Sequence, residues 1–375
     1  MQINVNSSSI IQELFICSSV ASGKQAIPIL SDVLFCTDAK NNTATMTVSD
    51  SEIWATLNIQ NVQSEKDTKF CVGIDHMLDV LRNLDNETDI SITLNEQNKT
   101  LKLSYGKGYV IMPYLESDEY PQPKYFPVNN FEINSAKVMS AIKKVLFAVD
   151  VDVLRPIISS VLFDISDDKM TTVGTNIKKL IKHSKRISGN NDGYEKSFAL
   201  PIKASNILYT ILSKRNDQRV WIGTDDKMLC VTGDDFKFVC ALQVGKYPNY
   251  NSIIPKEYKY KAIINKICFV GAIRRVKQMG ADDSISLAFI PNTVVVAAED
   301  SAMGKNASEK ITCNNNCNGF EIIFSFEELL PVVNNIEDDE IAMYFNSEKS
   351  AAIITASNEI DGEKTISLVM PLASL

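Results

Sequence analysis

The sequence contains little of what metal centres and hydrolytic sites are usually built from. Only two of its 375 residues are histidine, His76 and His183, and neither has a second histidine or a cysteine close by. A histidine-rich metal site or a Ser-His-Asp relay would depend on these two side chains. The glycine patterns GxGxxG and GxxxxGK[ST], which hold phosphate groups, are missing. The sequence therefore predicts no cofactor, no metal ion and no catalytic site.

Cysteine pairs, long apolar runs and a secretory leader are also lacking. The eight cysteines are scattered, mostly within apolar segments, which predicts buried, reduced thiols. Cys313 and Cys317 form a CxxxC pattern without the second pair that a zinc site needs. No stretch approaches the roughly 20 apolar residues that cross a bilayer. The N-terminus has no basic region followed by an unbroken apolar run, so we expect a cytoplasmic protein.

What the sequence does contain is a repeat of about 125 residues. A short strand followed by an amphipathic helix is expected from Ile3, again from Phe131 and again from Tyr258. Asn6 and Asn134 each precede a serine at the expected helix start, a typical N-cap position. A second helical pattern, followed by hairpin-forming runs, recurs in each third of the chain at 72–84, 200–214 and 324–336.

The repeats are separated by stretches rich in proline and tyrosine, near residues 127 and 257. Three periods fill the chain with nothing left over. The sequence therefore predicts three similar α+β domains at 1–127, 128–257 and 258–375. Three unrelated α+β domains with chance similarities are the alternative interpretation.

Positive charge is concentrated in the expected helices, although the chain has a formal net charge of −8. The helical segments 135–147, 203–215 and 262–277 carry an excess of Lys and Arg, while the strands and loops hold most of the Asp and Glu. If the helices share one surface, that surface suits a polyanion bound through its phosphates. Solvated helix faces are the alternative. No base-reading module is recognisable.

Four stretches resemble the bacterial sliding clamp, the beta subunit of DNA polymerase III. They are IPIL at 27–30, LRPIISSVLFDIS at 154–166, KYPNYNSIIPK at 246–256, which is similar to clamps of Bacteroidetes-type bacteria, and the C-terminal LVMPLASL. The resemblance covers the whole chain. It implies an α+β fold of three tandem clamp domains, with helices lining an inner face and antiparallel sheets outside. It also implies that two chains close head-to-tail into a ring-shaped homodimer.

The function implied by this resemblance is non-catalytic. A ring that encircles duplex DNA is held by topology, so loose phosphate contacts suffice and permit sliding. Such a ring tethers the DNA polymerase III catalytic subunit and raises its effective concentration at the primer end. The clamp loader and repair proteins would bind through short peptide motifs. No membrane partner is implied.

The predicted DNA-binding residues are basic side chains at expected helix positions or at basic loop positions of the family. Neighbouring residues on a helix diverge by about 100°, so not all of them can face the same way. Asp75 and Asp152 depart from the family's basic and polar contact positions. The predicted set is Lys24, Lys137, Lys143, Lys144, Arg155, Lys203, Lys214, Arg215, Arg274 and Arg275.

The resemblance also implies a cleft between the second and third domains that receives a short, partly apolar partner peptide. The family motif T-D-x-H-[RK]-L reads Thr-Asn-Ile-Lys-Lys-Leu at 175–180, so Asn176 and Lys178 change the charge of the cleft rim. We therefore expect partner specificity to differ. The implied cleft residues are Ile158, Thr175, Ile177, Leu180, Pro248, Ile253, Leu368, Val369, Met370 and Leu372.

The implied ring seam joins the first domain of one chain to the third domain of the other. The segment 109–112 would supply an apolar edge strand that needs covering. Val110 and Met112 share one face of that strand and are the predicted seam residues, opposite residues 275–279.

Two other functions compete with a DNA-encircling clamp. One is a divergent clamp paralogue that binds other partners, motivated by Asp75 and by the changed rim. The other is a metal-dependent hydrolase, for which the pairs Asp225/Asp226 and Asp234/Asp235 are the best candidates. Paired aspartates between strands are typical of turns, which weakens the hydrolase interpretation.

Overall fold

The computed structural model divides into two compact units. Unit 1 comprises Met1–Met139 and Asn206–Leu242, and unit 2 comprises Ser140–Ser205 and Gln243–Leu375. No helix among the described residues is long and apolar enough to span a membrane. The structure describes the whole chain except residues 24, 86, 123–126, 128–130, 153, 167, 188–194, 216–217, 281–282, 318, 359–361 and 373–375.

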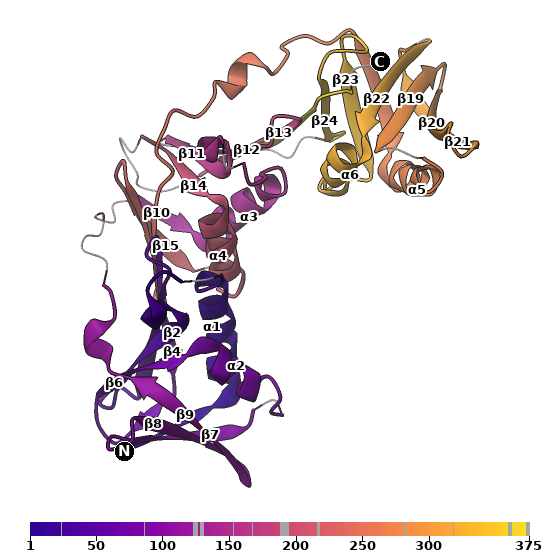
Figure 1. Cartoon of the computed structure of the whole chain (residues 1–375). Coiled ribbons are helices and arrows are strands. Elements are labelled where there is room, and N and C mark those ends of the chain that lie inside the picture. The colour runs from indigo at the N-terminus through magenta and orange to yellow at the C-terminus, as the bar shows by residue number, and fades with distance from the viewer. Residues whose placement is uncertain are drawn as a thin grey trace. The chain divides into compact units, whose positions relative to one another are not determined.

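The same strand–helix opening occurs three times, as the sequence predicts (Figure 1). In each case the N–H of the first helical residue donates to a loop carbonyl at 2.8 Å, from Ser7, Ser135 and Lys266 respectively. The three openings are β1 (Gln2–Asn6) with α1 (Ser7–Val20), β10 (Phe131–Asn134) with α3 (Ser135–Leu146), and β18 (Tyr260–Asn265) with α5 (Lys266–Lys277).

An asparagine caps each of these helices. The Oδ1 atoms of Asn6, Asn134 and Asn265 accept backbone N–H groups at 3.0, 2.8 and 3.0 Å, which satisfies a donor that the first turn leaves unpaired. The first two caps were predicted from the Asn-Ser pairs and are confirmed. The third was missed because lysine, not serine, follows Asn265.

The second helix of each repeat is also present: α2 (Ile74–Leu81), α4 (Ile202–Ser213) and α6 (Phe326–Asn334). Figure 1 shows α1 beside α2 in unit 1, and α5 beside α6 in unit 2. Helix α6 begins with Ser325 as its N-cap and continues through Pro331. The predicted buried thiols are buried or half-buried except Cys268, which is exposed on α5.

All strand pairings in unit 1 are antiparallel and form one 13-stranded sheet, in the order β10-β15-β16-β17-β4-β3-β2-β6-β9-β8-β7-β1-β5. Its other strands are β2 (Asp32–Asp38), β3 (Thr43–Ser49), β4 (Ile53–Gln60), β5 (Gln63–Ser64), β6 (Thr68–Gly73), β7 (Asp89–Asn95), β8 (Thr100–Tyr105), β9 (Gly108–Leu115), β15 (Arg219–Thr224), β16 (Met228–Thr232) and β17 (Phe236–Ala241).

Unit 2 contains a 12-stranded antiparallel sheet in the order β14-β11-β12-β13-β25-β24-β23-β18-β21-β20-β19-β22. Its other strands are β11 (Ser160–Ser166), β12 (Lys169–Thr175), β13 (Lys179–Arg186), β14 (Lys196–Pro201), β19 (Ser284–Ile290), β20 (Thr293–Asp300), β21 (Lys305–Asn315), β22 (Phe320–Ser325), β23 (Glu340–Phe345), β24 (Ala352–Ala356) and β25 (Glu363–Val369).

One strand pair in each unit joins two repeats. In unit 1, β4 of the first repeat pairs with β17, the last strand of the second, with Ile53 opposite Cys240. In unit 2, β13 of the second repeat pairs with β25, the last strand of the third, with Lys179 opposite Val369. We call these pairs the first and second junction. Because the central repeat contributes strands to both sheets, two of the three boundaries between the units fall inside α3 and α4, and the third follows β17, between Leu242 and Gln243.

A buried ion pair lies beside each junction. In unit 1, Arg215 is 4% exposed and binds Glu13 at 2.9 Å and Asp235 at 2.8 Å. Burial raises the pKa of the Glu13 carboxyl, and the Arg215 guanidinium opposes that rise. In unit 2, Lys179 of β13 binds Glu328 of α6 at 2.7 Å, and both side chains are buried. Each pair links a residue of the central repeat to a neighbouring repeat.

Replacing Arg215 is expected to destabilise the fold. Arg215→Met would leave Glu13 and Asp235 without their buried counterion, which costs about 3 kcal/mol in comparable cases. Urea unfolding measures the loss. The matched control is Arg219→Met, because Arg219 is exposed and pairs with Glu132 at 3.4 Å, so its loss should change stability by less than about 0.5 kcal/mol. Equal effects of the two substitutions would contradict the assignment.

The second junction should also make stability depend on pH through His183. His183 of β13 is fully buried, and its Nδ1 lies 2.9 Å from Thr365 Oγ1 of β25. Burial lowers its pKa to about 4. Between about pH 6.5 and 4, His183 is protonated in the unfolded chain but stays neutral in the folded chain. Its contribution therefore lowers the free energy of unfolding by about 3 kcal/mol as the pH falls through this window. Unfolding curves of His183→Gln should show a shallower decline than wild type, and parallel curves would disprove the effect.

Candidate functional site

The residues predicted for the peptide cleft come together in unit 2, around the second junction. Leu180 of β13 lies opposite Leu368 of β25, and the N–H of Met370 donates to the carbonyl of Lys178 at 2.8 Å. The chain that leaves β25 therefore continues alongside the turn between β12 and β13. Leu372 follows, with its N–H donating to the carbonyl of Ile323 on β22 at 2.8 Å. We call this surface the groove, after the peptide cleft that the resemblance implies.

The groove residues divide into a buried floor and an exposed rim. Leu180 and Leu368 belong to an apolar cluster against which Tyr247, Tyr250 and Ile254 pack. Tyr247, Tyr250 and Ile254 thus pack against the buried residues of the groove. The buried members are Ile158, Thr175, Leu180, Leu368 and Val369, and the exposed members are Ile177, Pro248, Ile253, Met370 and Leu372. Only the exposed group is in a position to meet an incoming apolar side chain.

Asn176, where the resemblance implies an aspartate, lies between two carboxylates. The Nδ2 of Asn176 donates to Glu328 at 2.9 Å and to Asp150 at 2.8 Å. An aspartate here would bring three carboxylates together and remove the Nδ2 donor that Asp150 and Glu328 share. Lys179 completes the cluster through its buried pair with Glu328. The charge added to the rim is therefore Lys178, whose side chain is exposed, and not Asn176.

Lys179 and Glu328 were not predicted as part of this site. Glu328 is the third helical residue after Ser325, and its N–H donates to Ser325 Oγ at 3.3 Å. The sequence pattern S-x-x-E is typical of a capping box, which accounts for Glu328 without reference to any partner. Its carboxylate instead binds a lysine that lies far away in the sequence. No local pattern carries that information.

The predicted DNA-binding residues differ in how available they are. Lys143, Lys214 and Arg274 are exposed on or next to α3, α4 and α5, and Lys137 and Lys203 are half-buried. Two exposed arginines are engaged in ion pairs, Arg155 with Asp152 at 2.7 Å and Arg275 with Glu309 at 2.6 Å. Arg215 is buried, so we no longer assign it to DNA. Lys24 lies outside the described residues.

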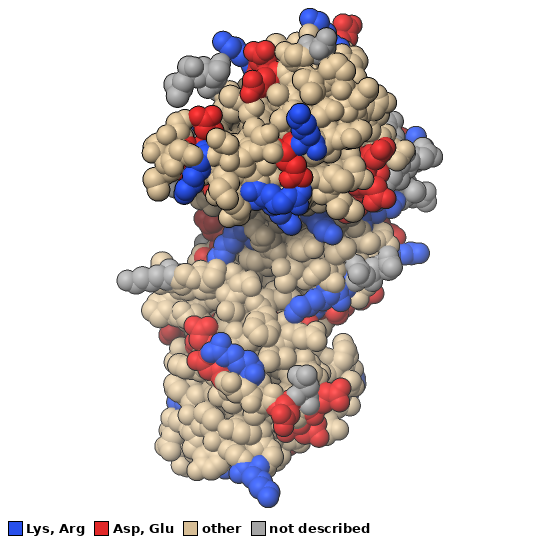
Figure 2. Space-filling model, turned by 90° about the vertical axis from the view of Figure 1, so that its right-hand side faces the viewer, with Lys and Arg blue, Asp and Glu red and all other residues tan. Residues whose placement is uncertain are grey.

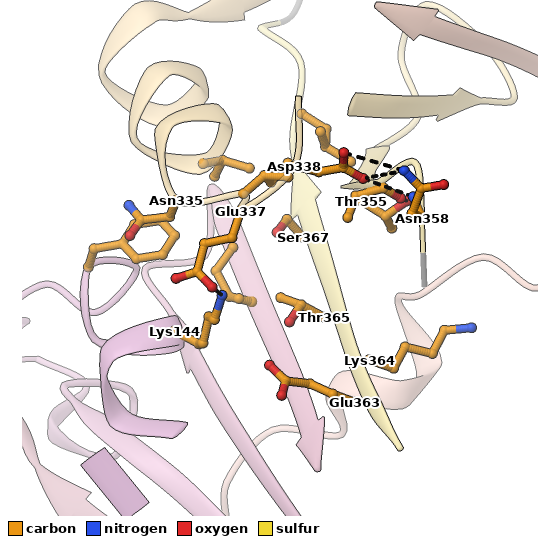
Figure 3. Close-up of a pocket in the computed structure, with 16 residues that line it drawn as sticks. Lys144, Asn335, Glu337, Asp338, Thr355, Asn358, Glu363, Lys364, Thr365 and Ser367 are labelled. Atoms are coloured by element: carbon orange, nitrogen blue, oxygen red, sulfur yellow. Dashed lines mark hydrogen bonds and ion pairs between the residues drawn. The ribbon is translucent and has the colours of Figure 1, made fainter. Parts of the chain in front are cut away.

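Lys144 is engaged in the interior of unit 2. It projects from α3 into a cavity of about 260 Å³ beside the second junction, where it binds Glu337 at 2.8 Å (Figure 3). Across the cavity Asp338 accepts hydrogen bonds from Asn358. The Lys144 side chain is 13% exposed. It therefore helps to hold the central and third repeats together and offers little to a phosphate.

The face drawn in Figure 2 carries Lys and Arg interspersed with Asp and Glu in both units. An unbroken positive field is not visible on it. Such a mixture suits weak phosphate contacts better than tight binding, because each nearby carboxylate reduces the local potential.

The predicted seam strand β9 is an open edge. It pairs with β8 along its length, but with β6 only at Tyr114 and Leu115, so in the described part of the chain Gly108–Pro113 has no partner on that side. Met112 is 5% exposed and Val110 is half-buried, whereas Tyr109 and Ile111 are 59% and 57% exposed. The side chains available to a second chain are therefore Tyr109 and Ile111.

A second open edge lies on β21. This strand pairs with β20 from Lys305 to Thr312, but with β18 only at Cys313–Asn315. Among the described residues, Lys305–Ile311 has no partner on its outer side. β21 follows the first hairpin of its repeat, as β4 and β13 do in theirs.

The aspartates considered for a hydrolase are engaged in structure. Asp225 Oδ1 accepts the N–H groups of Lys227 and Met228, both at 2.8 Å, and so holds the β15–β16 turn. Asp235 binds Arg215. In the described part of the chain, no group of three His, Cys, Asp or Glu residues is arranged to hold a metal ion.

Comparison with known proteins agrees with this architecture. Family models of the DNA polymerase III beta subunit match along the chain, the N-terminal domain at residues 1–124, the central domain at 132–249 and the C-terminal domain at 251–372. The beta sliding clamp of Buchnera aphidicola subsp. Rhopalosiphum padi is 22% identical over 364 residues, which is 96% of each chain.

Solved structures share the fold over the full length of both chains. The sliding clamp of Bartonella birtlesii bound to griselimycin has a TM-score of 0.91 at 20% identity. The clamp of Bacillus subtilis has a TM-score of 0.89 at 20% identity. The α+β fold of three tandem clamp domains is thereby confirmed. Since three consecutive domain models account for nearly all of its residues, the chain belongs to the bacterial DNA polymerase III beta subunit family, the beta sliding clamps.

Proposed function

We propose that two copies of this chain close head-to-tail into a ring around duplex DNA in the cytoplasm. The observation that carries this proposal is the pair of open edges. Within one chain, β4 and β13 are covered by the last strand of the following repeat. The equivalent strand β21 has no following repeat, and β9, the last strand of the first repeat, has no preceding one. Pairing β21 with β9 of a second copy, twice, satisfies all four edges.

The seam would be stabilised by side chains of the exposed β9 face. Tyr109 and Ile111 are large, apolar and exposed, and an open apolar edge is an aggregation hazard unless another chain covers it. Val110 and Met112 would contribute their backbone groups to the strand pairing. The domain boundaries at 127 and 257 fit this scheme, because each repeat then brings one strand that follows its first hairpin (β4, β13 or β21) and one last strand.

The ring would hold DNA without a catalytic step. Lys143 and Arg274 are the basic helical residues best exposed for phosphate contacts, with Lys137 and Lys203 as further contributors. The Nζ of Lys214 donates to the carbonyl of Gln12 at 2.7 Å, so Lys214 is less available. Sequence-independent contacts of this kind leave the ring able to slide. A partner held in the groove would stay near the primer end, which is how a clamp confers processivity on DNA polymerase III.

Opening the seam should abolish both dimerisation and retention on DNA. Ile111→Lys places a charge on the proposed seam, so light scattering should change from the mass of two chains to that of one. Wild-type protein loaded onto nicked circular DNA should remain bound until the DNA is linearised, and Ile111→Lys should not be retained. Val244→Lys is the control, since Val244 is an exposed apolar residue of unit 2 outside the proposed seam. Wild-type retention that ignores linearisation would rule out a ring.

Removing the exposed anchors should weaken partner binding without opening the ring. Met370→Ala combined with Leu372→Ala removes two rim side chains, each expected to contribute over about 1 kcal/mol, so the affinity should fall at least tenfold. The measurement is fluorescence titration with a clamp-binding peptide from a bacterial DNA polymerase III catalytic subunit, with griselimycin as a second probe.

The control for this titration is Ile267→Ala on α5, which changes an exposed apolar residue away from the groove. An unchanged affinity of the double variant would place the site elsewhere. A wild-type protein that forms rings but binds the polymerase peptide poorly would favour the divergent paralogue, for which the exposed Lys178 on the rim is the supporting observation.

A further inference from the structure

The turn between β12 and β13 holds an isoleucine in an unfavourable conformation. Ile177 has φ = 80°, in the left-handed region, where a branched Cβ crowds the backbone. The other described non-glycine residues with positive φ are asparagine, serine, glutamate and lysine. Ile177 is the only β-branched residue among them. The first central position of such a turn ordinarily favours glycine.

The first repeat contains the same turn and serves as an internal comparison. There Ser51 has φ = 79°. Ser51 N–H donates to Ser49 Oγ at 3.0 Å, as Ile177 N–H donates to Thr175 Oγ1 at 3.0 Å. Each turn also closes with a 3.2 Å hydrogen bond from its first N–H to the carbonyl of Ile53 or Lys179. The turn therefore dictates the positive φ, and the isoleucine is not required to produce it.

The strained turn is held from two sides. Asn176 Oδ1 accepts the N–H groups of Lys178 and Lys179, and its Nδ2 binds Glu328 of α6. On the other side Met370 N–H donates to the carbonyl of Lys178. Backbone strain persists where the surroundings determine the conformation this strongly. The buried pair of Lys179 and Glu328, together with the half-buried Asn176, thus supports the position of Ile177.

The two junctions differ in the side chains they present. Ala241 N–H donates to the carbonyl of Glu52 at 2.8 Å, which corresponds to the bond from Met370 to Lys178. The first junction therefore carries Ser51 and Ala241 where the second carries Ile177 and Met370. Both residues of the second junction are large and apolar, and they are 48% and 42% exposed. Burial in the core does not explain the isoleucine.

We propose that Ile177 is a specificity-determining residue of the groove, whose side chain forms an apolar wall against an apolar anchor residue of the partner peptide. A glycine at this position would relieve the strain of the turn, but it has no side chain with which to form the wall. This inference rests on the proposed peptide groove. Under this proposal the Ile177 side chain increases the affinity for the peptide, while its strained backbone lowers the stability of the folded protein.

The test measures stability and affinity on the same full-length variants. Ile177→Gly should raise the melting temperature by a few degrees, because it relieves the strain, and should weaken binding of the fluorescent polymerase peptide at least about fivefold. Ile177→Val keeps the branched side chain and should retain affinity within about twofold. Ser51→Gly is the matched control, which should raise the melting temperature and leave the affinity unchanged.

The outcomes separate this inference from the groove itself. If Ile177→Gly binds the peptide as wild type does, while Met370→Ala with Leu372→Ala weakens it, the groove stands and the wall is disproved. If none of these variants affects binding, the groove is misplaced and the inference falls with it. A lower melting temperature for Ile177→Gly would disprove the strain.

Discussion

The architecture depends on one constraint, that an exposed strand edge must be covered. Each repeat offers the strand that follows its first hairpin as an edge, and in the first two repeats the last strand of the next repeat covers it. A backbone edge left open would recruit other chains without control. Three repeats in a row satisfy this requirement twice and leave one edge open on β9 and one on β21. The ring proposed above repeats the same pairing between two chains.

The buried ion pairs at these junctions matter more for selecting one arrangement of neighbouring repeats than for the free energy of unfolding. Arg215 with Glu13 and Asp235, and Lys179 with Glu328, each connect two repeats. A buried ion pair is often no more stabilising than an apolar replacement, but it strongly disfavours any arrangement that leaves one partner unpaired. Basic residues of the central repeat thus have two uses. Some orient neighbouring repeats, and the exposed ones remain available for phosphates.

The sequence carried the repeat, the helices and two of the helix caps, because these features depend on residues close to one another in the chain. The sequence did not predict that Arg215 and Lys144 form ion pairs between repeats, because their partners lie far away in the sequence. A positive charge alone does not show whether a side chain forms such an ion pair or lies exposed on the surface. The seam shows a second limit. Side chains alternate along a strand, and the sequence does not say which side of β9 faces solvent: Tyr109 and Ile111 are exposed, whereas Met112 is buried and Val110 half-buried.

The groove illustrates how repetition and divergence combine. The backbone hydrogen bonds at the first and second junctions match, down to the N–H of Ala241 or Met370 on the carbonyl of the adjacent turn. Function is therefore not a consequence of the scaffold, which is present at both places. It depends on side chains that one junction has and the other lacks. The first junction carries the small residues Ser51 and Ala241, whereas the second exposes two large apolar residues, Ile177 and Met370, one of them in a strained conformation, and this difference is what the proposed peptide binding depends on.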